Sequence, residues 1–246
     1  MRSLLFIAIA SAIAFLPVSD PAVSNSDSVL VLSVEYQSLL KEIESGTGQT
    51  SLEPLADFQN RISTRLNEVE ALSEKDFGRF KNNMRGFLVN REEIVFVKPD
   101  PTFFQKLARG KGLPADIAFF DLLIKVRPDG VWSAYTRPQT DYSGCTLYGT
   151  GKLTELYGLL DSFKETFPSA YVQMVDDELD YVIKALTTGT CACEGLPSAI
   201  KEFELFIEKY PDAKITPDFE IACLILMRKA RSGLSVHQVS YETFIS

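Results

Sequence analysis

Residues 51–72, SLEPLADFQNRISTRLNEVEAL, carry the clearest structural pattern in the chain. Apolar side chains recur in this stretch at steps of three and four, which places them on one face of a helix. They are Leu52, Leu55, Phe58, Ile62, Leu66, Val69 and Leu72. The stretch therefore predicts an amphipathic helix whose apolar face needs a partner.

Helical patterns flank this stretch on both sides. Ser26 to Ser28 offer caps for a helix that ends at Gly46. Ser73 and Asp76 have the spacing of a capping box, which opens a third helix running through Leu88. Successive helices with short connections predict a helical hairpin or small bundle over residues 23–90.

The pattern changes after Asn90. Ile94 to Val97 is short and rich in β-branched residues, so it predicts a strand. Arg127-Pro128-Asp129-Gly130 has turn chemistry, because proline fixes φ and glycine accepts a positive φ. The turn separates Leu122–Val126 from Val131–Thr136. We expect these two runs to form a β-hairpin, with residues 94–97 as a possible third strand. Between them, Asp100-Pro101 caps a short helix that ends at Gly110.

Helical spacing returns from Lys152 onward, with apolar stripes that begin at Leu153 and Val172. Pro197 opens a further helix, and Thr216 caps another. The expected fold class is α+β and mainly helical, in which helical segments flank a small antiparallel sheet and disulfides tie the C-terminal helices. Residues 91–246 form the α+β segment, either beside the helical segment 23–90 or in one compact domain with it.

The helix opened by Pro197 carries a recognisable pattern, A-x3-F-x2-F-I-x2-Y-P. Its residues are Ala199, Phe203, Phe206, Ile207, Tyr210 and Pro211. Residues 199–231 resemble one helix pair of a tetratricopeptide-type scaffold, of the sort seen in periplasmic assembly proteins. The resemblance implies a helical hairpin and a binding role. We find no second copy at a fixed period in the sequence, whereas a stable array needs about three.

Composition narrows the classes of partner. The 246 residues include 25 Lys and Arg against 33 Asp and Glu, which gives a net charge of -8. An acidic chain is poorly suited to nucleic acid or to an anionic membrane surface. We therefore expect a protein or a cell-envelope component as the partner, and no nucleic acid.

The first residues indicate export. Arg2 precedes an apolar run from Leu4 to Leu16 that is followed by Pro17 and Asp20. A basic start, a short apolar centre and small residues near its end are typical of a secretory signal peptide, which we assign to residues 1–22. The run is shorter than the roughly 20 residues of a membrane span. We expect a periplasmic or secreted protein with no membrane span in the mature chain.

An exported chain encounters oxidising conditions, which favour disulfides. We expect two bridges, in which Cys191 and Cys193 each reach elsewhere, one to Cys145 and the other to Cys223. A zinc site lacks its usual C-x2-C knuckles here. A redox-active C-x-C pair of Cys191 and Cys193 remains an alternative.

Other chemistry-bearing patterns are weak, and we expect no cofactor, no metal and no catalytic residue. His237 is the only histidine and lies near the C-terminus. Gly144 to Lys152, GCTLYGTGK, lacks the residues of a phosphate-binding P-loop, so a small anion site is only the minor interpretation. Asp176, Asp177, Glu178 and Asp180 form an acidic cluster, which fits a solvated helix face better than a calcium loop.

The best binding candidates are aromatic and basic. Tyrosine and arginine are enriched at interface hot spots, and a segment held by a disulfide would present them at little ordering cost. The candidates are Tyr135, Arg137, Tyr142 and Tyr148, with Arg109 and Lys111 in a basic loop. The tyrosines alternatively cover the core at the edge of the sheet.

These patterns favour an exported, non-catalytic binding module, leaving open whether the protein is an enzyme. The first alternative is a hydrolase that acts outside the cytoplasm with two carboxylates, which requires facing acids with perturbed pKa in a cleft. The second is a thiol redox protein that uses Cys191 and Cys193.

Overall fold

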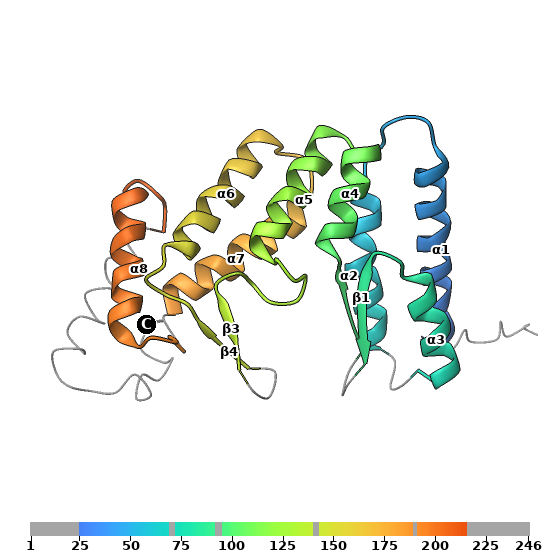
Figure 1. Ribbon diagram of the computed structural model, residues 1–246, viewed down its shortest axis with the longest axis horizontal. Coiled ribbons are helices and arrows are strands. Elements are labelled where there is room, and N and C mark those ends of the chain that lie inside the picture. The colour runs from blue at the N-terminus through green and yellow to red at the C-terminus, as the bar shows by residue number, and fades with distance from the viewer. Residues whose placement is uncertain (1–24, 69–71, 92–94, 140–142, 189–190, 216–246) are drawn as a thin grey trace, which may run out of the picture.

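The fold is described from a computed structural model, which covers residues 25–68, 72–91, 95–139, 143–188 and 191–215. Within these ranges the chain forms eight helices and two small antiparallel sheets, so the mainly helical α+β class is confirmed. The predicted signal peptide, residues 1–22, lies outside the described residues, as does His237. Figure 1 shows an elongated molecule with its N-terminal helices at one end and α8 at the other.

Three helices form the N-terminal end: α1 (Asn25–Ser45), α2 (Glu53–Asn67) and α3 (Glu74–Asn83). The amphipathic stripe of α2 is confirmed, because Leu55, Phe58 and Ile62 are buried. The predicted cap of α3 at Ser73 is confirmed as well, since the Ser73 hydroxyl accepts a hydrogen bond from the Asp76 backbone N–H at 3.1 Å. Both α2 and α3 end earlier than the apolar pattern predicts.

A hairpin follows α3. Strand β1 (Phe87–Arg91) pairs antiparallel with β2 (Val95–Pro99), and Val89 lies opposite Val97. The strand expected at residues 94–97 is therefore confirmed in its described part. Strand β1 crosses residue 90, where the sequence places a segment boundary.

The β-hairpin predicted over residues 122–136 is wrong. Residues 122–126 are the end of helix α5 (Pro114–Val126), which follows the capped helix α4 (Pro101–Lys111). A short apolar run cannot distinguish a buried strand from a buried helix by periodicity alone. The turn itself is present, because Gly130 has φ of 76°. It lets the chain leave α5 and turn back, and the second sheet instead pairs β3 (Thr136–Pro138) with β4 (Gly144–Thr146).

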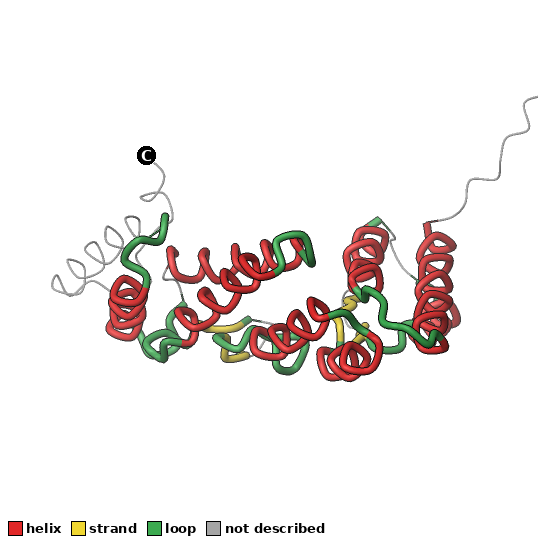
Figure 2. Tube along the Cα trace, turned by 90° about the horizontal axis from the view of Figure 1, so that it is seen from above, coloured by secondary structure: helices red, strands yellow, loops and turns green. Residues whose placement is uncertain are grey.

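The C-terminal helices are α6 (Lys152–Thr166), α7 (Val172–Thr188) and α8 (Leu196–Lys209), as the apolar stripes predict. Helix α6 packs against α5, α7 and α8. Figure 2 shows that the helices are arranged side by side along the length of the molecule. Both hairpins lie along the lower edge in Figure 1.

Aromatic side chains connect the two ends of the molecule through one core. Tyr36 of α1 packs against Phe87, Phe87 against Phe104, and Phe104 stacks on Phe120 at 5.1 Å between ring centroids. Phe120 in turn contacts Tyr171, which precedes α7. The N-terminal helical segment and the segment after it therefore share a single hydrophobic cluster.

Three helices end in the same way, which the sequence search did not detect. In each, the capping residue donates its backbone N–H to the carbonyl four residues earlier at 2.7 to 2.8 Å, has φ between -135° and -129°, and is followed by proline. The capping residues of α5, α6 and α8 are Arg127, Phe167 and Tyr210. This ending recurs about every 40 residues, a period within the range of helical repeats.

The tetratricopeptide-type resemblance of residues 199–231 stays a prediction. Its first helix is α8, but the second, expected from Thr216, lies outside the described residues. Helix α7 packs against α6 after the shared ending, so α6 and α7 form a complete helix pair.

Candidate functional site

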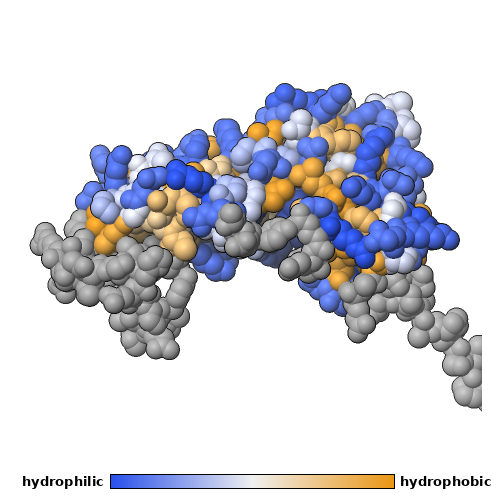
Figure 3. Space-filling model, turned by 60° about the horizontal axis from the view of Figure 1, so that its bottom comes forward, coloured by the Kyte–Doolittle hydropathy of each residue, from blue (hydrophilic) through white to orange (hydrophobic). Residues whose placement is uncertain are grey.

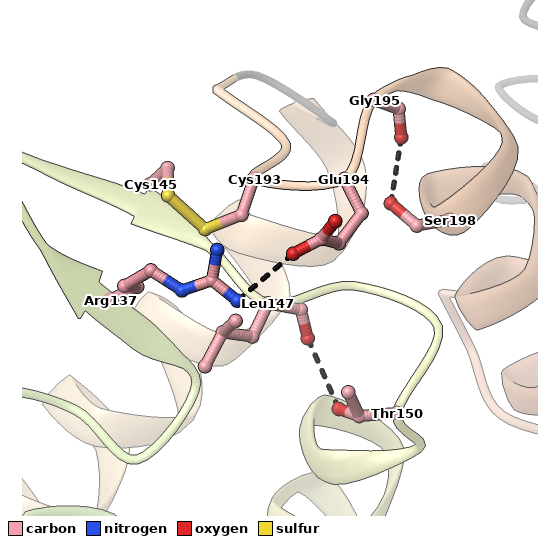
Figure 4. Close-up of a disulfide and its surroundings, with 8 residues drawn as sticks. All are labelled: Arg137, Cys145, Leu147, Thr150, Cys193, Glu194, Gly195 and Ser198. Atoms are coloured by element: carbon pink, nitrogen blue, oxygen red, sulfur yellow. Dashed lines mark hydrogen bonds and ion pairs between the residues drawn. A yellow bond between two sulfur atoms is a disulfide. The ribbon is translucent and has the colours of Figure 1, made fainter.

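The segment predicted to bind a partner is held by a disulfide. Cys145 of β4 is bonded to Cys193, 48 residues later in the chain, as Figure 4 shows. Backbone hydrogen bonds reinforce this link, because Thr146 N–H donates to Cys191 O at 2.8 Å and Cys193 N–H donates to Thr146 O at 3.0 Å. The loop before α8 is thereby fastened to the β3–β4 hairpin.

Only one of the two predicted disulfides is present in the described residues. Cys193 takes the expected partner Cys145, whereas the Cys191 thiol is free and exposed. Cys191 has a positive φ of 52°, so the backbone turns sharply between the two cysteines. The other expected partner, Cys223, lies outside the described residues.

Two of the candidate tyrosines are buried. Tyr135 is 7% exposed and Tyr148 is 2% exposed, and the Tyr148 hydroxyl donates to the Ala185 carbonyl. These two side chains hold the segment onto the core and offer little surface to a partner. Tyr142 lies outside the described residues. Arg137 is exposed and pairs with Glu194 at 2.9 Å. This ion pair lies beside the Cys145–Cys193 disulfide (Figure 4).

The two basic candidates, Arg109, which is exposed, and Lys111, which is half-buried, are already paired within the chain. Arg109 contacts Asp121 at 3.1 Å, which joins α4 to α5. Lys111 donates to the Gly46 carbonyl at 2.5 Å, which joins the end of α4 to the loop after α1. Neither lies beside Arg137 on the β3–β4 hairpin, so the structure does not unite the predicted contacts in one surface element.

The glycine-rich segment before α6 already holds an anion supplied by the chain. The fully buried Glu202 of α8 accepts hydrogen bonds from Gly151 N–H at 2.8 Å, Thr154 N–H at 3.1 Å and the Thr154 hydroxyl at 3.0 Å. Free N–H groups at a helix N-terminus favour a negative charge. The minor interpretation of this segment as an anion site thus has a structural explanation, since Glu202 caps α6.

A recess lies elsewhere, between α2 and α7. Both helices begin at one point, where the Glu53 carboxylate accepts a hydrogen bond from Tyr171 N–H at 2.8 Å. From there they diverge, α2 down the right and α7 down and to the left in Figure 1. The recess between them has a volume of about 260 Å³, and we call it the α2–α7 groove.

Asp116 fixes the closed end of the groove. This carboxylate is 1% exposed and accepts hydrogen bonds from the Tyr171 hydroxyl at 2.5 Å, Leu52 N–H at 3.0 Å and Leu113 N–H at 2.6 Å. It therefore ties the starts of α2, α5 and α7 together. Burial, and then the hydrogen bond to Asp116, raise the pKa of Tyr171 far above its usual value, so Tyr171 remains a neutral donor.

The two walls change character from the closed end to the mouth. Ser63 of α2 and Tyr181 of α7 each stand ten residues beyond the Glu53–Tyr171 contact, which is about 15 Å of helix. Close to the closed end the walls are apolar, with Ala56 and Met174, and Phe119 lies between them. Towards the mouth the walls are polar. The polar wall residues are Gln59, Asn60 and Ser63 on α2, and Asp177, Glu178 and Tyr181 on α7.

The floor of the groove contains an ion pair. Arg127 donates to both oxygens of Glu178, from Nε at 2.5 Å and from an Nη at 3.1 Å, and also to the Val131 carbonyl. Burial opposes the charge on Arg127, but the bond to Glu178 outweighs it and raises the pKa of Arg127. The 127–130 turn is packed against the β1–β2 hairpin, because a Cβ added at Gly130 would lie 2.9 Å from the Pro99 carbonyl oxygen.

Lys98 of β2 lies on the same floor but, unlike Arg127, is not paired with any residue that the structure describes. Its ammonium is partly buried, and among the residues that the structure covers it has no hydrogen-bond or ion-pair partner. Burial, and then the positive charge of Arg127, lower the pKa of Lys98. A cation held in a recess without a partner is costly for the free protein and attractive to an anion.

The acidic run 176–180 is on α7 and does not gather into a metal site. Asp176 pairs with Lys164 at 2.5 Å, and Glu178 is held by Arg127. Across the described ranges, no group of three or more acidic, histidine or cysteine side chains is arranged to hold a metal ion. No helix there has the length and hydrophobicity needed to cross a bilayer.

Little in the sequence indicates this groove. Lys98 and Arg127 come from a strand and a helix cap, and Gln59 and Ser63 come from the polar flank of a helix. Only Arg127 belongs to a sequence motif, the Arg127-Pro128-Asp129-Gly130 turn, and that motif indicates a turn and no binding site.

Comparisons with protein-family models, with curated proteins and with solved structures give no match to this chain. Its function is therefore inferred from the geometry of the chain itself.

Proposed function

We propose that the chain is an exported, non-catalytic binding module that recognises a protein or another cell-envelope component through the α2–α7 groove. The observation that carries this is the recess itself, with an apolar closed end and polar groups that converge towards its mouth. Binding sites in proteins combine an apolar lining with placed polar groups. Here eight of the fourteen lining residues are polar or charged, which favours a polar partner.

Hydrogen bonds and an ion pair hold the groove in place in the protein without a partner. Its closed end is fixed by the buried Asp116, and its floor is fixed by the bidentate pair of Arg127 and Glu178, whose side chains are 17% and 16% exposed. A preformed site loses little conformational entropy on binding. At the mouth, Tyr181 is 52% exposed, with the Arg127 guanidinium 5.8 Å from its ring centre. Tyrosine and arginine are both enriched at interface hot spots.

The molecular surface has a mixed polar and apolar character. The view in Figure 3 is mainly hydrophilic, with hydrophobic residues in patches towards the middle of this face. Such a mixture is typical of interfaces that form and dissociate, whose overall polarity resembles the rest of the surface.

The carboxylate hydrolase is less well supported at this site. Asp177 and Glu178 are the acidic residues of the groove, but Arg127 engages both oxygens of Glu178. Asp177 is exposed and accepts a hydrogen bond from Gln173 at 2.8 Å. A general acid needs a carboxyl that stays protonated, which a bidentate arginine opposes.

The thiol redox alternative is also less well supported. It requires Cys191 and Cys193 to act as a pair, whereas Cys193 is bonded to Cys145. That disulfide supports export, because such bonds persist mainly in oxidising compartments. We propose that residues 1–22 are the signal that directs export.

Site-specific photocrosslinking in the source cells tests the binding function. A benzoylphenylalanine in place of Tyr181 is expected to give a crosslinked product at the mouth of the groove. The same group in place of Lys201, which is exposed on α8, serves as the control. The captured component must then bind the purified protein directly. A crosslink pattern identical at the two positions, or a hydrolytic activity lost in Asp177→Asn, would overturn the proposal.

The remaining predicted contacts can be tested in the same assay. Arg137 is the exposed candidate on the disulfide-bonded segment, with Arg109 and Lys111 on α4. Charge reversal of each, for example Arg137→Glu, should weaken capture if that residue contacts the partner.

A further inference from the structure

We propose that the α2–α7 groove takes an acidic side chain, glutamate or aspartate, projected from an extended segment of a protein partner, with the carboxylate placed on Lys98. This names the partner chemistry of the groove and rests on the proposed binding function. The occupant is thus an acidic peptide segment.

Charge complementarity is the first argument. Lys98 brings a positive charge to the floor of the groove, and within the described part of the chain no acidic side chain pairs with it. The neighbouring positive charge of Arg127 is already satisfied by Glu178. Glu178 also acts on Lys98, but from beyond ion-pair distance, and it is itself held by Arg127. Among the described residues, the charge in the floor without a hydrogen-bond or ion-pair partner is therefore that of Lys98, and an incoming carboxylate would match it.

The arrangement of the walls gives the carboxylate a path. Both acidic residues of the groove, Asp177 and Glu178, belong to α7, whereas the α2 wall is uncharged. Lys98 belongs to β2, which packs against α2. A carboxylate that enters along α2 avoids the acids of α7. The side chains of Gln59, Asn60 and Ser63 are available there as hydrogen-bond donors.

The size of the groove favours one side chain over a long ligand. A volume of about 260 Å³ is below the range of about 300 to 1,000 Å³ usual for sites that enclose a drug-sized molecule. The aliphatic part of a glutamate can lie against Leu123 of the floor while its carboxylate reaches Lys98. The amide and hydroxyl groups of the α2 wall match a peptide better than an acyl chain, which would leave them unpaired.

Lys98 also has no evident structural purpose. A partly buried cation without a partner destabilises a folded chain, so a neutral residue of similar length would serve the fold at least as well. Burial lowers the pKa of Lys98, which is the expected sign of that cost. A destabilising cation that lies in a recess, as Lys98 does, is the pattern expected of a binding residue.

Peptide display on the folded full-length protein tests this. A library of linear peptides displayed with their C-termini fused to a coat protein offers acidic side chains but no free terminal carboxylate. We expect enrichment of peptides with Asp or Glu beside an apolar residue. Lys98→Met should abolish the acidic preference, Lys98→Arg should retain it, and the exposed control Lys201→Met should leave it unchanged.

A double-mutant cycle then isolates the contact. One enriched peptide is made with amidated ends in a Glu form and a Gln form, and its affinity is measured by calorimetry. The Glu form should bind wild type about tenfold more tightly than the Gln form, the range of a charge-assisted hydrogen bond. On Lys98→Met the two forms should differ by less than about twofold.

The outcomes separate this inference from the proposed function. Peptides that bind the groove with no acidic preference, or that keep it on Lys98→Met, would overturn the acidic-anchor assignment while leaving a binding module. Octanoate that competes for the groove more tightly than the peptide would show that an acyl chain is the occupant, and would overturn it too. Failure of any peptide to enrich, together with no crosslink at Tyr181, would overturn both.

Discussion

Tyr171 donates its phenolic proton to Asp116 at 2.5 Å, and this bond joins α7 to α5 where the α2–α7 groove closes. Both side chains are buried, and Asp116 simultaneously accepts the backbone N–H groups of Leu52 and Leu113. One carboxylate therefore holds three segments that are distant in the sequence.

Removing the Tyr171 hydroxyl should destabilise the fold. Tyr171→Phe deletes one hydrogen bond to a buried carboxylate and should lower the free energy of unfolding in urea by about 1 to 3 kcal/mol. Tyr181→Phe is the matched control, because Tyr181 is exposed at the mouth of the groove and should change stability by less than about 0.5 kcal/mol. Equal effects of the two substitutions would contradict the role of Asp116.

Tyr171 should also make the free energy of unfolding fall at alkaline pH. Its pKa is raised in the folded protein, by burial first, whereas in the unfolded chain it titrates near 10.0. The unfolded state therefore loses this proton first, and stability conferred by the neutral Tyr171 is lost as the pH rises above about 10. Tyr171→Phe should show a shallower decline of stability than wild type in urea titrations between about pH 9 and 11.

Glu202 should be essential for the attachment of α8 to α6. Glu202→Ala removes three hydrogen bonds and leaves two backbone N–H groups at the start of α6 unsatisfied, which should cost about 2 to 5 kcal/mol. Glu204→Ala on the exposed face of the same helix should cost less than about 0.5 kcal/mol. Chemical denaturation measures both, and a small effect at Glu202 would show that another group caps α6.

The disulfide should be identifiable and stabilising. Digestion without reductant should yield a peptide pair linked through Cys145 and Cys193, while Cys191 reacts with an alkylating reagent. Replacing both bonded cysteines by alanine should cost about 4 kcal/mol in the loop-entropy model, given their sequence separation of 48. Cys191→Ala is the control and should have little effect. Recovery of Cys145 linked to Cys191 would contradict this connectivity.

Lys98 should oppose stability while it is charged. Its pKa is lowered from 10.5, so the unfolded chain binds the proton more tightly and stability rises with pH between the folded and unfolded values. Lys98→Met should therefore be at least as stable as wild type near pH 7, and the difference should shrink as the pH approaches 10.5. Arg127 and Glu178, the charged groups that act on Lys98, are common to both proteins. A clear destabilisation of Lys98→Met would indicate a structural role instead.

The elements with strong local signals were predictable from the sequence. The stripe of α2, the cap at Ser73 and the stripes of α6, α7 and α8 all match the structure, because each depends on neighbours within a few turns. The hairpin expected at residues 122–136 failed for a related reason. Residues 122–126, four apolar residues and Lys125, are too few to show a period. The burial of Leu122, Leu123 and Val126 at helical spacing emerges only when α5 is extended back to Pro114.

The groove was not predictable, because its residues are brought together by tertiary packing. Glu178 was interpreted as part of a solvated acidic face, yet Arg127 buries it. Tyr135 and Tyr148 carry the composition of a binding segment, but side-chain type alone does not reveal which way a residue faces. The shared ending of α5, α6 and α8 was missed because only phenylalanine or tyrosine and the following proline recur clearly, in Phe167-Pro168 and Tyr210-Pro211.

That shared ending has a consequence for how the molecule can vary. From α5 onward the chain advances by similar steps, and each step is supported chiefly by the ones beside it. Architectures of this type gain or lose whole steps without disturbing distant ones. Helix α8, at the far end of this row, is remote along the chain from Lys98. The length of the row and the composition of the groove can therefore change independently. Because α8 contributes no residue to the α2–α7 groove, that end can be lengthened while the groove keeps its lining.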